Sequence, residues 1–260
     1  MTKTILITGA TDGIGLLTAK TLTAEGHNVL LHGRSADKLE AAAHEVGGNP
    51  ETYRADLSLL ADVNALVADV RAKHDTLDVL INNAGVLKVP NTQTDSGLDV
   101  RFMVNAIAPW ALTVGLLPII PKDGRVVSLS SAAQAPVNIK AMRGEQQLGH
   151  NEAYAQSKLA LTIWSQELAR EHPEGPVFVS VNPGSLLATK MVKESYGMAG
   201  NDLRIGADIL RRAAVSEEFA NASGQYYDND TGRIARPHPA AADRAHVAQL
   251  MAAIRELAGA

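Results

Sequence analysis

Residues 4–15 read Thr4-Ile-Leu-Ile-Thr-Gly-Ala-Thr-Asp-Gly-Ile-Gly15 and place three glycines between a short apolar run and the start of a helical pattern. The apolar run predicts a β-strand, and the spacing from Ile14 predicts a helix. Glycine lets the chain turn tightly and lets an anion approach the unpaired N–H groups of the helix N-terminus. The turn therefore predicts a phosphate-binding site, with a plain tight turn as the alternative. The residues expected at the phosphates are Gly9, Thr11, Asp12, Gly13, Ile14 and Gly15.

Short apolar strands and amphipathic helices alternate along the rest of the chain. Further strands are predicted at Asn28–His32, Glu51–Arg54, Asp78–Ile81, Arg125–Leu129, Val177–Val181 and Gly224–Tyr227. Helices are predicted at Ile14–Glu25, Ser35–Val46, Leu59–Lys73, Leu98–Leu117 with a bend near Pro109, Tyr154–Glu171 and Ala241–Leu257. This alternation is typical of an α/β protein with a doubly wound, mostly parallel sheet, here of about seven strands. Because no linker or repeat interrupts it, we expect residues 1–260 to form a single domain.

Two long segments, 135–152 and 186–202, follow the fifth and sixth predicted strands. Long connections at the carboxyl ends of parallel strands tend to carry function. We therefore expect both segments to contribute to a substrate site.

The chain has 260 residues, 46% of them hydrophobic and 20% charged, and a formal net charge of −4. This balance is ordinary for a soluble globular protein and gives no reason to expect a nucleic-acid partner. The absence of cysteine excludes disulfides and thiolate metal sites, and the eight histidines lack the spacing of metal ligands. Met1-Thr-Lys-Thr4 leads directly into a strand, and no apolar stretch of bilayer length stands out. We therefore expect a cytoplasmic protein without a membrane partner.

Tyr154 and Lys158 are four residues apart on a predicted helix and therefore lie on one face of it. A free tyrosine has a pKa of about 10, which is too high for an efficient base at neutral pH. A neighbouring ammonium favours the phenolate and lowers that pKa. The pair can therefore exchange a proton with an alcohol or a developing alkoxide, although in isolation it would be an accidental surface pair.

Three motifs occur in order between residues 8 and 189: the glycine turn, Asn82-Asn-Ala-Gly85 after the fourth predicted strand, and Tyr154-x-x-x-Lys158. Together they resemble the short-chain dehydrogenase/reductase family. The resemblance implies a Rossmann fold that transfers a hydride between a nicotinamide cofactor and a small-molecule carbonyl or alcohol. It also implies a homodimer or homotetramer and chemistry that needs no metal.

By the same resemblance, the fifth strand ends in a serine that hydrogen-bonds the substrate oxygen. The register favours Ser131, and Ser130 is the alternative because neighbouring strand residues face opposite ways. Asn105 is implied to relay protons through water to the lysine, and a locally paired helix residue is the alternative. The implied catalytic set is Asn105, Ser131, Tyr154 and Lys158.

The second predicted strand is followed by Gly33-Arg34. A carboxylate at this point selects NAD through the ribose 2′-hydroxyl, whereas a nearby arginine pairs with the 2′-phosphate of NADP. Gly33 stands where the family places that acid, so Arg34, with Lys38 one helical turn later, predicts NADP(H). NAD(H), with a merely solvated Arg34, is the alternative, and Asp12 argues against a phosphate-rich environment.

Further cofactor contacts follow from the resemblance alone. Asp56 would contact the adenine or belong to a helix N-cap region, and the two roles are compatible. Pro183-Gly184 is implied to lie beside the nicotinamide, with Thr189 at the carboxamide. One residue more than usual separates Gly184 from Thr189, so Ser185 is a rival. The other implied contacts are Leu57, Asn83, Ala84, Gly85, Tyr154 and Lys158.

The long Ser131-to-Tyr154 gap and the late Gly224-Gln-Tyr-Tyr227 are similar to the retinol-dehydrogenase-like branch, whose members often act on lipophilic alcohols or aldehydes. Seven apolar residues would line such a pocket or simply pack the loops: Val137, Ile139, Met142, Leu186, Leu187, Met191 and Met198. The rival functions are a cofactor-binding sensor without turnover, and an isomerase or dehydratase on the same fold. The intact catalytic set argues against the sensor.

Overall fold

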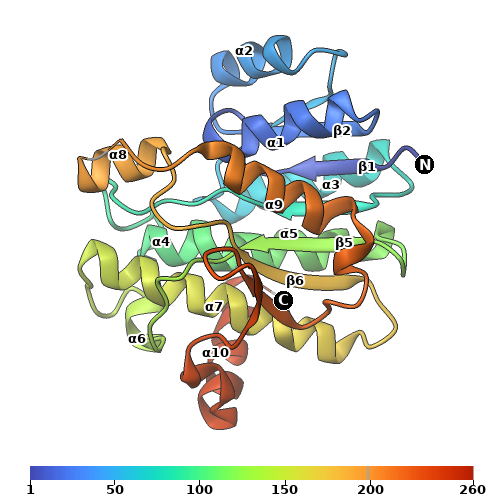
Figure 1. Cartoon of the computed structure of the whole chain (residues 1–260). Coiled ribbons are helices and arrows are strands. Elements are labelled where there is room, and N and C mark those ends of the chain that lie inside the picture. The colour runs from blue at the N-terminus through green and yellow to red at the C-terminus, as the bar shows by residue number, and fades with distance from the viewer. Residues whose placement is uncertain (198, 260) are drawn as a thin grey trace.

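The computed structural model describes residues 1–197 and 199–259, which form a central sheet between two helical layers (Figure 1). The strands are β1 (Thr4–Ile7), β2 (Asn28–Gly33), β3 (Thr52–Arg54), β4 (Val79–Asn82), β5 (Arg125–Leu129), β6 (Val177–Asn182), β7 (Gln225–Asp228) and β8 (Arg233–Ala235). Their order across the sheet is β3-β2-β1-β4-β5-β6-β7-β8. From β1 the next strands are added on one side of the sheet, and from β4 onward they are added on the other side. Open α/β sheets bind their ligands at such a switch in strand order, here between β1 and β4.

The predicted doubly wound α/β fold with a mostly parallel sheet of about seven strands is confirmed. The sheet has eight strands within the described residues, and the unpredicted one is β8, which pairs antiparallel with β7. Its three residues, Arg-Ile-Ala, form no apolar run because an edge strand is not covered on both faces.

Alternate residues of the central strands enter two separate hydrophobic cores. In β1, Leu6 packs into the core shared with α3, α5 and α7, whereas Ile5 and Ile7 pack into the core shared with α1, α2 and α9. All three side chains are fully buried. Both faces of the sheet are therefore covered, which is why its inner strands read as continuous apolar runs.

The helices mostly follow the predicted bounds. They are α1 (Gly13–Ala24), α2 (Ala36–Val46), α3 (Leu60–Lys73), α4 (Val100–Phe102), α5 (Ala108–Leu116), α6 (Ile139–Met142), α7 (His150–Glu171), α8 (Lys190–Tyr196), α9 (Leu203–Val215) and α10 (Arg244–Leu257). A π-helix, η1 (Met103–Ile107), joins α4 to α5, and the 3-10 turns are η2 (Leu117–Ile119), η3 (Glu217–Phe219) and η4 (Pro239–Ala242). The predicted cap of α2 is confirmed, since the Ser35 side chain accepts from the Lys38 backbone N–H.

Three helical segments differ from the prediction. The predicted helix Leu98–Leu117 is interrupted by η1 rather than bent at Pro109, which lies in the first turn of α5, where a proline is tolerated. The helix that carries Tyr154 starts four residues earlier, at His150. The segments 135–152 and 186–202 are not bare loops, because they contain α6 and α8.

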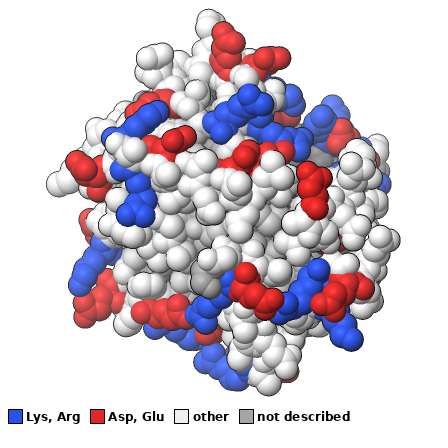
Figure 2. Space-filling view, turned by 180° about the vertical axis from the view of Figure 1, so that it is seen from behind, with Lys and Arg blue, Asp and Glu red and all other residues white. Residues whose placement is uncertain are grey.

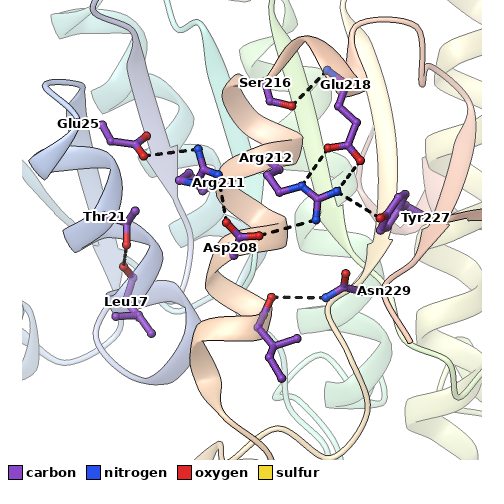
Figure 3. Close-up of polar contacts among 11 residues, drawn as sticks. Leu17, Thr21, Glu25, Asp208, Arg211, Arg212, Ser216, Glu218, Tyr227 and Asn229 are labelled. Atoms are coloured by element: carbon purple, nitrogen blue, oxygen red, sulfur yellow. Dashed lines mark hydrogen bonds and ion pairs between the residues drawn. The ribbon is translucent and has the colours of Figure 1, made fainter. Parts of the chain in front are cut away.

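Helix α9 was assigned to no element by the sequence, although it packs against α1 over most of its length. An ion pair supports this contact, because Arg211 of α9 lies 3.5 Å from Glu25, the residue that caps the end of α1 (Figure 3). Arg212 binds Glu218, just beyond the end of α9. Helix α9 covers the sheet beside β5 and β6, so its apolar face is set by the tertiary core.

One helical stretch in the described part of the chain, Val100–Ile119, is long and apolar enough to cross a bilayer, with a mean hydropathy of 1.7. The expectation that no stretch reaches bilayer length is therefore wrong. In the folded protein 67% of that stretch is buried. Core helices and membrane helices share this composition, and burial inside the protein is what distinguishes this one.

Candidate active site

The carboxyl ends of the central strands open into a cavity of about 640 Å³, a size typical of ligand sites. Residues at the ends of β1, β2, β4, β5 and β6 line it, together with the start of α8. All residues of the implied catalytic set and of the implied cofactor contacts line this cavity except Asn105. The fold therefore brings the predicted cofactor and catalytic residues into one space.

The glycine turn is built against the Asn-Asn-Ala-Gly segment. The Asn83 side chain donates to the carbonyl oxygens of Thr8 at 2.8 Å and Gly9 at 3.0 Å. A Cβ on Gly9 would lie 2.9 Å from Ala84 Cα, and one on Gly15 would lie 2.4 Å from Asn83 Nδ2. These two glycines are therefore required by packing, and Asn83 sets the shape of the turn.

The third glycine faces the cavity. Gly13 has a φ of +54°, and a Cβ there would meet only the Thr189 methyl group at 3.9 Å. Helix α1 begins at Gly13, so its N-terminus points at open space that suits a phosphate group. The Asp12 carboxylate already accepts the Gly13 N–H at 2.7 Å, which places a negative charge beside this anion site. The glycine turn therefore fits the phosphates of a dinucleotide, although the Asp12 carboxylate would repel them.

His32, one of the eight histidines without metal-ligand spacing, supports the glycine turn. The Gly9 N–H donates to His32 Nδ1 at 3.3 Å, and His32 Nε2 lies 3.2 Å from the Ala55 carbonyl oxygen. Burial lowers the pKa of His32 to about 4, and the hydrogen bond to Ala55 opposes this only in part. The neutral ring therefore joins the glycine turn to the end of β3.

The predicted adenosine end contains one exposed cation. Arg34 lines the cavity, its side chain is 76% exposed, and it lies 3.8 Å from the Asp56 carboxylate. Asp56 accepts from the Ser58 backbone at 2.9 Å and from its hydroxyl at 2.7 Å, one turn before α3. The N-cap of α3 itself is Leu59. Asp56 therefore shapes the chain before α3 and still lines the cavity, as does the buried Leu57.

Packing, as well as electrostatics, favours a glycine rather than an acidic residue at position 33. A Cβ there would lie 2.4 Å from the Thr11 methyl group and 3.2 Å from Leu39. Any larger residue at this position would therefore require the Thr11 side chain to move. Lys38, the second predicted cation, does not line the cavity.

At the other end of the cavity, Lys158 of α7 lies beside Tyr154. Lys158 is only 3% exposed, and its ammonium donates to the Leu129 carbonyl oxygen at 2.7 Å. Its Nζ atom is 5.5 Å from the centre of the Tyr154 ring. Burial lowers the pKa of Lys158 to about 8. A buried positive charge therefore lies next to a tyrosine that lines the cavity.

The two serines after β5 differ in their surroundings, although both line the cavity. Ser130 is buried, and its hydroxyl lies 2.6 Å from the Thr162 hydroxyl on α7. Ser131 is half-buried, and its hydroxyl accepts the Ala133 N–H at 3.1 Å, which leaves its own proton available. The geometry thus favours Ser131 as the donor to a bound oxygen.

Asn105 lies behind the cavity wall, in the π-helix η1. Its amide oxygen accepts the Val86 N–H at 2.8 Å, and its amide nitrogen donates to Val86 O and to the Ser157 hydroxyl, both at 2.9 Å. A Cβ on Gly85 would lie 3.4 Å from both Asn105 Oδ1 and Lys158 Nζ. Gly85 therefore keeps open the short path between the asparagine and the lysine.

The predicted nicotinamide turn, Pro183-Gly184, is tied to the β7–β8 turn. Asp230 accepts from the Ser185 backbone N–H at 2.8 Å and from the Ser185 hydroxyl at 2.5 Å. Thr189 caps α8 with its hydroxyl and lines the cavity, with its methyl group close to Gly13 of the glycine turn. Asp230 was not singled out by the sequence, because nothing local connects residues 45 positions apart.

The model of the family described as short chain dehydrogenase matches residues 3–199. The chain belongs to the short-chain dehydrogenase family. Among curated relatives of this dehydrogenase, retinol dehydrogenase 13 of Homo sapiens is 29% identical and covers 99% of the chain and 85% of its own. The mouse (Mus musculus) retinol dehydrogenase 12 is 30% identical over 87% of the chain and 78% of its own. The predicted resemblance to the retinol-dehydrogenase-like branch is confirmed.

Solved structures agree with this assignment. A protein from Mycobacterium paratuberculosis described as uncharacterized has a TM-score of 0.82 and 29% identity, over 99% of this dehydrogenase and 93% of its own chain. A short chain dehydrogenase from Shigella flexneri, complexed with NADP, has a TM-score of 0.70 and 26% identity, over 88% and 97% of the two chains. Residues beyond 199, including β7 and β8, lie outside the family match and still contact the site.

Proposed function

We propose that this short-chain dehydrogenase transfers a hydride between NADP(H) and a carbonyl or alcohol, with Tyr154 as the acid/base. The observation that carries the proposal is the shared cavity: Tyr154, Ser131 and the buried Lys158 line the same space as the glycine turn. A cofactor whose phosphates lay at Gly13 would extend along the strand ends toward these three residues.

The nicotinamide supplies or accepts the hydride when it is bound. In the reducing direction, the Ser131 hydroxyl donates to the substrate oxygen and stabilises the charge that develops there. The Tyr154 hydroxyl gives that oxygen its proton, and the Lys158 ammonium stabilises the phenolate that remains. Asn105 holds Val86 in place and supports proton exchange with Lys158 across the gap at Gly85. The oxidising direction uses the same groups in reverse.

The preference for NADP(H) is supported by Arg34, which lines the cavity, and by the close packing of Thr11 and Leu39 around Gly33. Because Arg34 is exposed, we expect Arg34→Ala to raise the KM for NADPH by about tenfold and to leave the KM for NADH nearly unchanged. Lys38→Ala is the matched control, since Lys38 does not line the cavity. Wild-type protein that prefers NAD(H) would refute this half of the proposal.

A lipophilic substrate is supported by apolar residues of the segment 186–202. Of the apolar residues predicted for this role, Leu186, Leu187 and Met191 line the cavity. Val137 and Met142 are buried in the core instead, and Ile139 packs against it. Met198 lies outside the described residues. Segment 186–202 is therefore the better supported substrate segment, and 135–152 supports α7 from behind.

The test is a panel of short and long aldehydes, ketones and alcohols, followed by NADPH absorbance with wild type, Tyr154→Phe and the control Tyr227→Phe. We expect Tyr154→Phe to lose at least about 100-fold in turnover, the usual contribution of a general acid, while NADPH still binds. Unchanged turnover in that variant would remove Tyr154 from its role. NADPH binding without oxidation of any compound would favour the sensor, and product formation without a net absorbance change would favour an isomerase or dehydratase.

We also propose a homodimer or homotetramer formed through the helices that carry Asn105 and Tyr154. Seen from the side opposite α1 and α9, the centre of the surface lacks charged residues and is surrounded by mixed charges (Figure 2). Uncharged centres with polar margins are typical of protein interfaces. Light scattering at micromolar concentration tests this, and a mass of 27.5 kDa would contradict it.

A further inference from the structure

We propose that Tyr226 of β7 is a positioning residue that holds Ser131 in place for the reaction, an inference that rests on the proposed role of Ser131. The Tyr226 hydroxyl donates to the backbone carbonyl oxygen of Ser131 at 3.1 Å, although 95 residues separate the two in sequence. Tyr226 does not line the cavity, so it acts on the backbone of Ser131 rather than on a bound substrate.

The Ser131 carbonyl has a second donor, which shows that this peptide is held from two sides. Gln134 Nε2 donates to the same oxygen at 3.0 Å, while its own amide oxygen accepts the His238 N–H at 2.8 Å. The carbonyl carbon and the hydroxyl-bearing Cβ are bonded to the same Cα, so holding this carbonyl limits the displacement of the Cα from which the hydroxyl extends. Tyr226 and Gln134 together therefore hold the backbone from which the Ser131 hydroxyl reaches the cavity.

Tyr226 is suited to be a permanent donor. It is 5% exposed, and burial together with the nearby carboxylates of Asp228 and Asp230 raises its pKa above the ordinary value. The phenol therefore stays protonated throughout the pH range of an ordinary assay. This distinguishes it from Tyr154, which lines the cavity beside a buried ammonium.

The contact comes from a part of the chain that the family match does not include. Tyr226 and His238 both lie beyond residue 199, where the match ends. β7 joins the sheet next to β6, and its turn toward β8 also holds Ser185 through Asp230. The carboxy-terminal segment thus supports both walls of the reaction end of the cavity.

The neighbouring Tyr227 provides a matched control. It is also 5% exposed, but it lies on the opposite face of β7, with its ring 5.0 Å from that of Phe219. Its hydroxyl accepts from Arg212 at 3.4 Å, away from the cavity (Figure 3). Tyr227→Phe therefore removes a buried tyrosine hydroxyl from the same strand without touching Ser131.

The experiment compares full-length wild type with Tyr226→Phe, Tyr227→Phe, Ser131→Ala and the Tyr226→Phe/Ser131→Ala double variant. Carbonyl reduction is measured in a single turnover with enzyme in excess, so that slow variants stay measurable, and NADPH binding is measured by fluorescence. We expect Tyr226→Phe to slow turnover about fivefold, the factor of one ordinary hydrogen bond, with NADPH binding unchanged. Tyr227→Phe should keep the wild-type rate.

The double variant decides whether Tyr226 acts through Ser131. We expect the fivefold effect to disappear in the Ser131→Ala background, because no hydroxyl remains to be positioned. The same fivefold loss in that background, or an equal loss in Tyr227→Phe, would overturn the inference. Tyr154→Phe separates this from the proposed function: if that variant is inactive and Tyr226→Phe is not impaired, only the role of Tyr226 fails.

Discussion

Replacing His32 with asparagine should make the free energy of unfolding depend less on pH below neutrality. In the wild type the neutral ring accepts from Gly9 and contacts the Ala55 carbonyl in a buried site. Asparagine keeps an acceptor near the Nδ1 position but has no titrating group. We expect His32→Asn to be less stable at pH 7, because the contact to Ala55 is lost, and to lose less stability on acidification.

The magnitude follows from the pKa of His32, about 4 in the folded protein against an ordinary value of 6.5. A tenfold change in an equilibrium constant is worth about 1.4 kcal/mol, so this difference amounts to about 3.4 kcal/mol in full. Above pH 6.5 neither state is protonated, and the full stabilisation of the neutral ring is present. Between pH 6.5 and 4 the unfolded chain binds the proton and the folded protein does not, so the free energy of unfolding decreases as the pH is lowered. Of the total, about 2 kcal/mol is lost between pH 7 and pH 5.

The assay is urea unfolding at pH 7, 6 and 5, followed by the fluorescence of the buried pair Trp110 and Trp164, with no cofactor added. The free energy of unfolding of the wild type should fall by about 2 kcal/mol more than that of His32→Asn over this range. His44→Asn, at an exposed position of α2, is the control and should follow the wild type. Equal losses in wild type and His32→Asn would refute the assignment of a neutral, buried His32.

Three further outcomes are expected. Carbonyl reduction should decline as the pH rises through about 8, because the buried Lys158 then loses its proton, and a profile that stays flat to higher pH would contradict this. Asp12→Ser keeps a helix cap but removes a negative charge beside the expected phosphate position. NADPH should therefore bind about two- to fivefold more tightly at low salt, as measured by fluorescence titration. Unchanged affinity at low salt would contradict a phosphate at Gly13. Asp230→Asn weakens the hold on Ser185, so the KM for NADPH should rise about fivefold in steady-state kinetics while Tyr227→Phe leaves it unchanged.

The local features of the site could be predicted because they depend on short spacings. The glycine turn lies between one strand and the next helix, and Tyr154 and Lys158 share a helix face because they are four residues apart. The alternation of apolar strands and helices was sufficient for the doubly wound sheet. Its edge was not predictable, since β8 is short and lacks the apolar pattern of a covered strand.

The choice between Ser130 and Ser131 could not be made from the strand pattern alone. Both follow β5 and line the cavity, and only the position of α7 puts the Thr162 hydroxyl beside Ser130 rather than Ser131. Asp230 presents a similar case, because its contact with Ser185 depends on how β7 and β8 meet β6. Such choices depend on which elements become neighbours.

The fold class, the glycine turn and the Tyr154–Lys158 pair follow from the amino-acid order alone, because each depends on periodicity or on spacing within a few residues. The approach of Asn105 and Lys158 to Gly85, the support of Gly9 by His32 and the contact of Tyr226 with Ser131 depend on the folded chain. Strand order and register set these contacts, and they join residues that no local pattern links. Hydrogen-bond partners so far apart in the chain are fixed only when the sheet has formed.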